Sequence, residues 1–334
     1  MLVSVDGGAT KTVAILYDES EDSIVSCGVS GPSNFTSVPE EVAVQNILKA
    51  LEMAGISSNP VRHFYFGLAG VGDSQKDTET GKRICSRVSG GRPFIVENDG
   101  SAAYFLANMS SDGFVFAGGT GSVCFVQKDG ELKRLAGWGW LCGDEASGYW
   151  FGLRALNLAT READGIMESR DFVRLVEGHY GLPLRDAISE AQRNFSKRRI
   201  AALAPGLVDI ARMGNREADK VLEEASGYIA SLLHSSGVQG SGDVSVLGGT
   251  MLAGEAYLKK IRKRVGRALH YFYGYQVAVG GLMRMMQNLG LDVDRATRDR
   301  FLRELDDRIS SLPRDSVMEN LFFAKPPGRF GTFD

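Results

Sequence analysis

The chain opens with short runs rich in Val, Ile, Leu and Phe, each of which ends at a glycine or a polar residue. These runs are Leu2–Val5, Thr12–Tyr17, Ile24–Gly28, His63–Leu68 and Phe94–Val96. Their length and β-branched content predict strands. Between the third and fourth runs, the apolar residues recur at helical spacing, at Val44, Ile47, Leu48 and Leu51. Strands that alternate with helices predict an α/β domain.

Two signals predict the limits of that first helix. Ser37 and Glu40 have the spacing of a capping box, with Pro39 tolerated in the first turn. Gly55 stands where a helix commonly ends in a left-handed residue. A later helix is expected to start near Ser101, directly after the strand that ends at Val96.

A second start of the same pattern occurs at Phe114. When the N-terminal hairpin is shifted by about 111 positions, its apolar residues and its glycine pair overlay Phe114–Asp129 without a gap. The overlay predicts a duplicated α/β fold with domains at 1–110 and 111–312 and a C-terminal arm at 313–334. A helix near 280–290 can return to the first domain in such a fold.

The second half is predicted to be mostly helical. Tyr257–Tyr273 places Leu258, Ile261, Val265, Leu269 and Phe272 on one helical face and Lys and Arg on the other. The basic face is either a solvated surface or a site for an anion or partner. The arm after Pro313 is expected to be irregular, with Phe322, Phe323, Phe330 and Phe333 docking it, on another subunit for example.

Composition narrows the function classes. A net charge of −3 argues against a dedicated nucleic-acid binder. No run approaches the roughly 18 apolar residues of a membrane span, and no signal peptide is visible at the start. Four scattered cysteines predict reduced thiols in the cytoplasm. Glycine is in excess, at 41 of 334 residues or about 12%, against a usual share of roughly 7%.

Three glycine loops follow predicted strands, and backbone N–H groups in such loops can hold phosphate. Asp6-Gly7-Gly8-Ala9-Thr10-Lys11 adds an acid that can orient hydrated Mg²⁺, together with a hydroxyl and an ammonium. Gly118-Gly119-Thr120-Gly121-Ser122 has Ala117 in place of the acid. Gly248-Gly249-Thr250 could pack flat against a nucleoside. For each loop, an ordinary turn remains an alternative.

Carboxylates mark two further candidate positions. Asp99 follows a buried strand, where ligands bind in open α/β sheets, and is a candidate general base or else a helix N-cap. Asp144 and Glu145 lie among glycines and aromatics, which is typical of sugar binding. They could equally occupy the first turn of a helix and stabilise its dipole.

These motifs together resemble the BadF/BadG/BcrA/BcrD group of the actin/hexokinase/Hsp70 ATPase superfamily, and within it the N-acetylglucosamine-kinase-like sugar kinases. The matching segments are 6–12 (DGGATKT), 33–35 (SNF), 67–70 (GLAG), 97–100 (ENDG), 118–122 (GGTGS), 137–150 (GWGWLCGDEASGYW), 247–250 (LGGT) and 277–281 (VAVGG). They occur in the expected order from residue 6 to about 290. The arm after Pro313 is not covered.

The resemblance implies two RNase-H-like domains that close over ATP and a sugar, and a γ-phosphate transfer to a sugar hydroxyl. Position by position it implies Asp6 for Mg²⁺ and Asp99 as the base that accepts the hydroxyl proton. The phosphate contacts implied are Gly7, Gly8, Thr10, Lys11, Gly119, Thr120, Gly121 and Ser122. Gly248, Gly249 and Thr250 would border adenosine, and Asn34, Asn98, Asp144 and Glu145 would contact the sugar. A cytoplasmic homodimer is expected.

Departures from the family pattern leave the acceptor open. Ala9 replaces the usual third glycine, and Phe35 and Trp140 stand beside expected sugar contacts. The alternatives are a 2-keto-3-deoxygluconate kinase, whose acid substrate would need a Lys or Arg, and a broad-specificity hexokinase. An activator ATPase with an iron–sulfur cluster is disfavoured because no cysteine stands in a recognisable ligand motif. A non-catalytic sugar sensor would have no need of Asp6, Lys11 and Asp99.

Overall fold

The computed structural model describes residues 1–238, 242–321 and 330–333. The chain divides into two compact units, one formed by Met1–Ser110 with Tyr275–Phe330 and the other by Ser111–Gly274 with Gly331–Asp334. Residues 275–312, which the sequence analysis placed in the second domain, therefore belong to the first unit. In the described ranges, no helix is long and apolar enough to cross a membrane.

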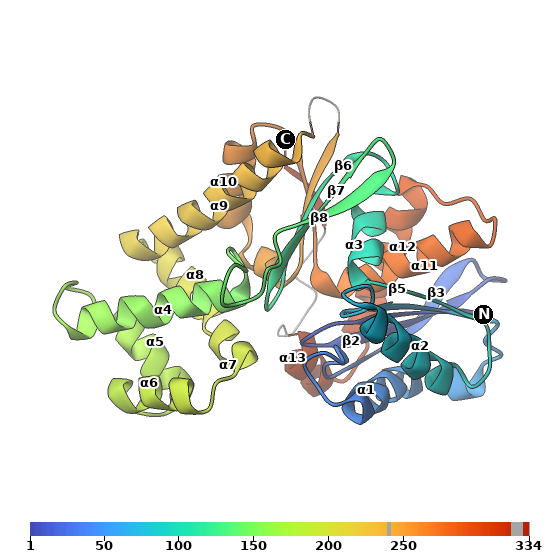
Figure 1. The fold of residues 1–334 in the computed structure, drawn as a ribbon, viewed down its shortest axis with the longest axis horizontal. Helices are drawn as coiled ribbons and strands as arrows, with labels where there is room; N and C mark the ends of the chain where they lie inside the picture. The colour runs from blue at the N-terminus through green and yellow to red at the C-terminus, as the bar shows by residue number, and fades with distance from the viewer. Residues whose placement is uncertain (239–241, 322–329, 334) are drawn as a thin grey trace. The chain divides into compact units, whose positions relative to one another are not determined.

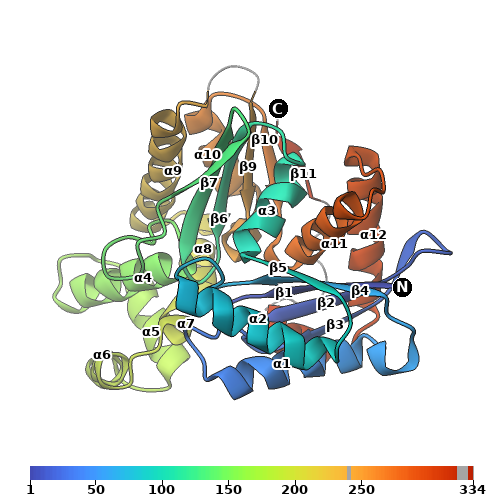
Figure 2. The ribbon, with the colours of Figure 1, turned by 45° about the vertical axis from the view of Figure 1, so that its right-hand side comes forward.

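The first unit is built on a five-stranded mixed sheet (Figure 1), whose strand order is β3-β2-β1-β4-β5, as labelled in Figure 2. β1 pairs with β2 in antiparallel fashion and with β4 in parallel, and β5 extends the parallel part. The strands are β1 (Leu2–Gly7), β2 (Thr12–Asp18), β3 (Ser23–Ser30), β4 (His63–Leu68) and β5 (Phe94–Glu97). All five predicted strands are present.

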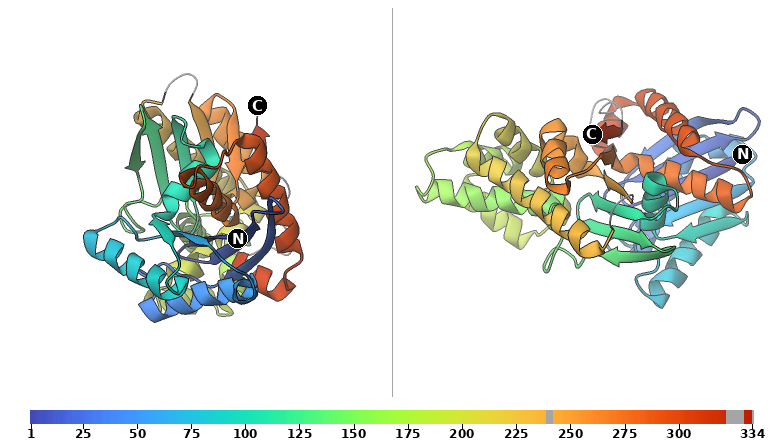
Figure 3. Two further views of the ribbon diagram at one scale, coloured as in Figure 1. Left: turned by 90° about the vertical axis from the view of Figure 1, so that its right-hand side faces the viewer. Right: turned by 90° about the horizontal axis from the view of Figure 1, so that it is seen from above.

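Helices cover both faces of this sheet, with α1 and α2 on one side and α3 and α11 on the other (Figures 2 and 3). The core beneath α1 and α2 is formed by Val3, Val5, Ile47, Phe64, Phe66 and Ile84 among others. The helices are α1 (Glu40–Met53), η1 (Ile56–Ser58), α2 (Gln75–Ser89), α3 (Asp99–Asn108), η3 (Gly274–Gln276), α11 (Val277–Asn288), α12 (Arg295–Ser310) and α13 (Arg314–Leu321).

The ends of α1 correct one prediction and agree with another. Pro39 occupies the N-cap position without a side-chain cap, and the Ser37 hydroxyl instead donates to the Asn34 carbonyl at 3.0 Å. The predicted capping box is therefore wrong, because the turn at Asn34 uses the serine. Gly55 has φ of 75° directly after the helix, as its predicted role requires.

The second unit has a six-stranded sheet with order β11-β10-β9-β6-β7-β8. Its strands are β6 (Gly113–Gly118), β7 (Ser122–Lys128), β8 (Glu131–Leu135), β9 (Asp243–Leu247), β10 (Leu269–Phe272) and β11 (Gly331–Phe333). Its helices are α4 (Gly148–Ala163), α5 (Asp171–Tyr180), α6 (Leu184–Arg193), α7 (Lys197–Ala201), α8 (Ala204–Arg212), α9 (Arg216–Ser236), η2 (Gly249–Ala253) and α10 (Glu255–Val265).

The two sheets share one topology. In each, three antiparallel strands that follow one another in sequence are extended by two parallel strands, β4 and β5 in the first unit and β9 and β10 in the second. The shift of 111 residues places β1 on β6 from end to end. The fold is therefore duplicated α/β, with the helical additions in the second unit.

Two predictions for the C-terminal region are wrong. The helix expected over Tyr257–Tyr273 ends at Val265, where Gly266 adopts φ of 75°, and Leu269–Phe272 forms β10 instead. The prediction failed because a spacing of three residues, from Leu269 to Phe272, fits one face of a helix and also the two ends of a four-residue strand. The arm after Pro313 is not irregular, since it contains α13 and β11, which pairs with β10. Phe322 and Phe323 lie outside the described residues.

Two matching glycines of the late helix serve packing. A Cβ on Gly280 would lie 2.1 Å from the Ala102 carbonyl oxygen, and one on Gly281 would lie 2.6 Å from Ser4 Oγ. α11 therefore approaches α3 and β1 closely only because these positions have no side chain. This contact fixes the late segment to the sheet that carries the first glycine loop.

Candidate active site

The first glycine loop joins β1 to β2 at the end of the central strand. Asp6 pairs with Val13 on one side and with Gly67 on the other, so it lies in the middle of the sheet. The Gly8 N–H donates to the Lys11 carbonyl at 3.0 Å and closes the turn. Lys11 Nζ then lies 3.9 Å from Asp6 Oδ2, beside the half-buried Thr10.

Asp6 is a buried carboxylate in an unfavourable setting. Burial raises the pKa of Asp6 to about 7; the Lys11 ammonium opposes that rise, and the charge of Asp99 adds to it. Among the described residues, no three His, Cys, Asp or Glu side chains form a preformed metal cluster. Mg²⁺ commonly uses one or two carboxylates together with substrate phosphates and water, so a buried carboxylate near a second one fits this ion.

Asn34 lies against the same loop. The backbone N–H groups of Ser33 and Asn34 both donate to the Gly8 carbonyl, at 3.0 Å and 3.1 Å. The Asn34 side-chain oxygen accepts from the Thr36 N–H and hydroxyl at 3.0 Å and 2.7 Å. The structure thus places Asn34 beside Gly8, and its contact with a sugar stays a prediction.

Asn98 and Asp99 have different tasks at the end of β5. Asn98 is the N-cap of α3, since its Oδ1 accepts from the Gly100 N–H at 2.9 Å, and its Nδ2 donates to the Val71 carbonyl at 2.7 Å. Asp99 is the first residue of the helix, where the dipole favours a carboxylate. Asn98 therefore occupies the N-cap position, and Asp99 Oδ1 accepts from the same Gly100 N–H at 3.0 Å. The half-buried Asp99 stays the candidate base.

In the second unit, the loop Gly118–Ser122 joins β6 to β7 and holds the segment that leads into α4. The Gly119 carbonyl accepts from the Gly148 N–H at 2.8 Å, and the Thr120 carbonyl accepts from the Tyr149 N–H at 3.1 Å. The Ser122 hydroxyl donates to the Glu145 carbonyl at 2.8 Å. Two of the predicted motifs are therefore joined by hydrogen bonds.

The third loop meets the second one directly. The Thr250 hydroxyl donates to the Gly118 carbonyl at 3.0 Å. Gly248 has φ of 113°, and a Cβ there would lie 2.2 Å from the same carbonyl oxygen. Gly249 and Thr250 begin η2, which is separated from β9 by Gly248 alone. The strand ends of β6 and β9 thus present their glycines side by side.

Asp144 and Glu145 precede α4, which has Ser147 as its N-cap, so neither occupies a first helical turn. Asp144 adopts φ of 59°. Its Oδ2 accepts from Lys197 Nζ at 2.7 Å. Glu145 Oε2 is buried and has no hydrogen-bond partner among the described residues. Sequence reasoning missed Lys197, because it lies in no motif and reaches Asp144 across 53 positions.

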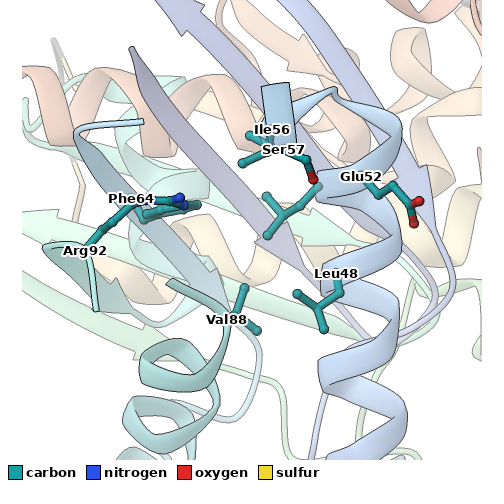
Figure 4. Close-up of a pocket in the computed structure, with 8 residues that line it drawn as sticks. Leu48, Glu52, Ile56, Ser57, Phe64, Val88 and Arg92 are labelled. Carbon is teal, nitrogen blue, oxygen red and sulfur yellow. The ribbon is translucent and has the colours of Figure 1, made fainter. Parts of the chain in front are cut away.

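A pocket of about 290 Å³ lies elsewhere in the first unit, between α1, η1 and α2 (Figure 4). It is lined by Leu48, Leu51, Glu52, Ile56, Ser57, Phe64, Val88 and Arg92. The Arg92 guanidinium lies over the Phe64 ring at 5.8 Å. None of the predicted site residues lines this pocket, so it is not the candidate active site.

Known proteins match the chain over most of its length. A model of the BadF/BadG/BcrA/BcrD ATPase family matches residues 3–284. The N-acetylmuramic acid/N-acetylglucosamine kinase of Clostridium acetobutylicum is 28% identical over 239 residues, which cover 67% of this chain and 75% of the relative.

Solved structures also match. A provisionally assigned N-acetylglucosamine kinase from Chromobacterium violaceum is 25% identical, with a TM-score of 0.67 over 84% of this chain and 97% of the other. A provisionally assigned enzyme of the same type from Porphyromonas gingivalis is 20% identical, with a TM-score of 0.70 over 87% and 100%, and this likeness concerns the fold alone.

Proposed function

Since the chain belongs to the BadF/BadG/BcrA/BcrD ATPase family, we propose that it is an ATP-dependent sugar kinase whose acceptor is a hexosamine such as N-acetylglucosamine. The kinase relatives support the reaction class. The observation that carries the proposal is the repeated glycine hairpin at the end of the central strand in both units, with Asp6 and Lys11 in the first copy and Ala117 in place of the acid in the second.

Each unit contributes its own contacts in this proposal. In the first unit, Gly7, Gly8, Thr10 and Lys11 contact the phosphates, and Asn34 and Asn98 contact the sugar. In the second unit, Gly119, Thr120, Gly121 and Ser122 contact the phosphates, Gly248, Gly249 and Thr250 border adenosine, and Asp144 and Glu145 contact the sugar. Asp6 would hold Mg²⁺, which when bound neutralises charge on the phosphate oxygens.

Asp99 performs the proton transfer. Its carboxylate orients the sugar hydroxyl and accepts its proton, while that oxygen forms a bond to the γ-phosphorus and the bond to the bridging β–γ oxygen breaks, so that ADP leaves. Lys11 and the loop N–H groups stabilise the charge on the transferred phosphoryl group. A positioned base of this kind contributes roughly 10²–10⁴-fold to the rate.

A coupled assay of ADP release tests the proposal. The acceptors are N-acetylglucosamine, N-acetylmuramic acid, glucosamine, glucose, N-acetylmannosamine and 2-keto-3-deoxygluconate, each with Mg²⁺ and ATP. We expect at least one acceptor to raise ADP release far above the sugar-free rate. ADP release that no acceptor stimulates would contradict the proposal. The homodimer and the cytoplasmic location stay predictions, and sedimentation analysis measures the former.

A further inference from the structure

An ion pair in the second unit lies against the backbone of the second glycine loop. Lys197 Nζ donates to Asp144 Oδ2 at 2.7 Å. A Cβ built on Gly121 would lie 3.0 Å from Lys197 Nζ and 2.8 Å from Asp144 Oδ2. Both charged groups therefore occupy the space over Gly121, and a side chain at that position would displace them.

The two members of the pair differ in exposure. The Asp144 side chain is 4% exposed, whereas that of Lys197 is 33% exposed. Asp144 is additionally fixed by a left-handed backbone, next to the segment that is hydrogen-bonded to the loop. The carboxylate is thus the more enclosed partner, and the ammonium is the more accessible of the two charged groups.

Exposed aromatic rings border the pair. Trp140 and Phe195 have ring centroids 4.7 Å apart and are 43% and 46% exposed. Tyr149 packs edge-on against both rings. Phe195 precedes Lys197 by two residues, so one short segment supplies an aromatic face and a cation.

We propose that Lys197 is a ligand-binding residue that contacts an anionic oxygen of a bound substrate, and that Asp144, in addition to its proposed contact with the sugar, holds the Lys197 ammonium over Gly121. The inference rests on the proposed kinase function. A lysine ammonium is a common partner of phosphate and carboxylate oxygens. The oxygen comes from the phosphates of the nucleotide or from a carboxylate on the acceptor, and separate binding measurements distinguish these sources.

Calorimetric titration of the full chain tests this without turnover. ADP, N-acetylmuramic acid and uncharged N-acetylglucosamine are titrated separately into the wild type, Lys197→Met and Lys197→Arg. The control is Lys220→Met, which removes another ion-paired lysine of the same unit, from α9. We expect Lys197→Met to weaken binding of ADP or of the carboxylated sugar by about tenfold or more, Lys197→Arg to recover part of it, and Lys220→Met to have no effect.

Each outcome either supports the role of Lys197 or overturns it. Weaker binding of ADP alone assigns the oxygen to phosphate, and weaker binding of N-acetylmuramic acid alone assigns it to a carboxylate. Unchanged affinity for both, or an equal loss that includes N-acetylglucosamine, would overturn the inference, because the latter marks a general structural effect. A wild type that binds none of the three would contradict the proposed function, and this inference would fall with it.

The positioning role of Asp144 has its own readout. If Asp144 acts through Lys197, Asp144→Asn should weaken binding of the same anionic ligand in the wild-type background. It should have little further effect on that binding in the Lys197→Met background. Its effect on uncharged N-acetylglucosamine measures its own contact with the sugar. If the additional loss for the anionic ligand is just as large in the Lys197→Met background, Asp144 does not act through Lys197, and that part of the proposal is overturned.

Discussion

Both carboxylate oxygens of Glu97 accept hydrogen bonds from the Arg284 guanidinium, at 3.0 Å and 3.1 Å. The Tyr65 hydroxyl donates to the same carboxylate at 2.9 Å. Glu97 ends β5 two residues before Asp99, and Arg284 comes from α11, far along the chain. Arg284 of α11 thus fixes the end of β5, which leads directly to the proposed base.

Loss of the Arg284–Glu97 ion pair should reduce turnover. We expect Arg284→Leu to lower kcat by roughly tenfold, because a small displacement of a base is costly to the rate. The same variant should lower the free energy of unfolding by about 1–2 kcal/mol, because the Arg284–Glu97 pair is partly buried. Arg83→Leu is the matched control, since Arg83 binds both oxygens of Glu40 on a more exposed surface. Equal kcat for the two variants would remove Arg284 from this role.

Asp99 itself should affect chemistry more than binding. Asp99→Ala is expected to leave the affinities for ATP and sugar nearly intact and to lower kcat by roughly 10²-fold or more. Steady-state kinetics combined with calorimetry separates the two effects. Near-normal turnover would show that another group accepts the proton.

The buried Asp6 predicts a pH-dependent stability. Its pKa is raised from 3.8 to about 7 by burial first of all, so the folded state binds more protons than the unfolded state between these values. The resulting penalty is absent below about pH 4, grows as the pH rises, and is complete above about pH 7. Asp6→Asn should therefore be more stable than the wild type at pH 8, by at most about 4 kcal/mol. It should also be inactive, because the proposed Mg²⁺ ligand is lost.

Urea denaturation of both proteins at pH 4.5 and pH 8 measures this difference. Asp18→Asn is the control, because hydrogen bonds from Ser20 hold the pKa of the exposed Asp18 below its usual value, so that any effect of this substitution should be nearly equal at the two pH values. An Asp6→Asn advantage that is equal at the two pH values would mean that Asp6 is not destabilised by its charge.

Alanine substitutions at the adjacent Gly248 and Gly249 should distinguish backbone strain from loss of a ligand contact. Gly248→Ala should lower the free energy of unfolding by roughly 1–3 kcal/mol, because its φ is 113° and a Cβ would collide with the Gly118 carbonyl. Gly249→Ala should leave stability nearly unchanged, since no heavy atom of the described chain lies within 4 Å of its Cβ position. Its effect is expected on the Kd for ADP. Equal instability of both variants in urea would contradict this distinction.

The repeated hairpin made much of the fold predictable. Regular alternation at Val3 and Val5, with a glycine turn after each central strand, sets the same local structure in both units. The helix over Tyr257–Tyr273 was wrong because a spacing of three between Leu269 and Phe272 does not distinguish a helix from a four-residue strand. Only the left-handed Gly266 decides between them.

The candidate site was predictable where its chemistry lies within one motif. Asp6 and Lys11 lie at the two ends of one turn, and Asp99 follows β5 by two residues, so sequence spacing places them at the carboxyl ends of strands of one sheet. Lys197 was not predictable, because its link to Asp144 depends on how α7 packs on α4. Which of Asn98 and Asp99 would cap α3 was not predictable either, because it depends on where the helix begins, which spacing does not fix.

The ratio of sugar phosphate formed to ATP consumed tests the central claim most directly. After incubation with Mg²⁺, ATP and the best acceptor, phosphorus NMR resolves the sugar phosphate, ADP and inorganic phosphate. The account predicts one sugar phosphate and one ADP for each ATP consumed, and roughly 10²-fold slower formation of both in Asp99→Ala. ATP consumption that yields inorganic phosphate, with no phosphorylated sugar from any acceptor, would contradict it.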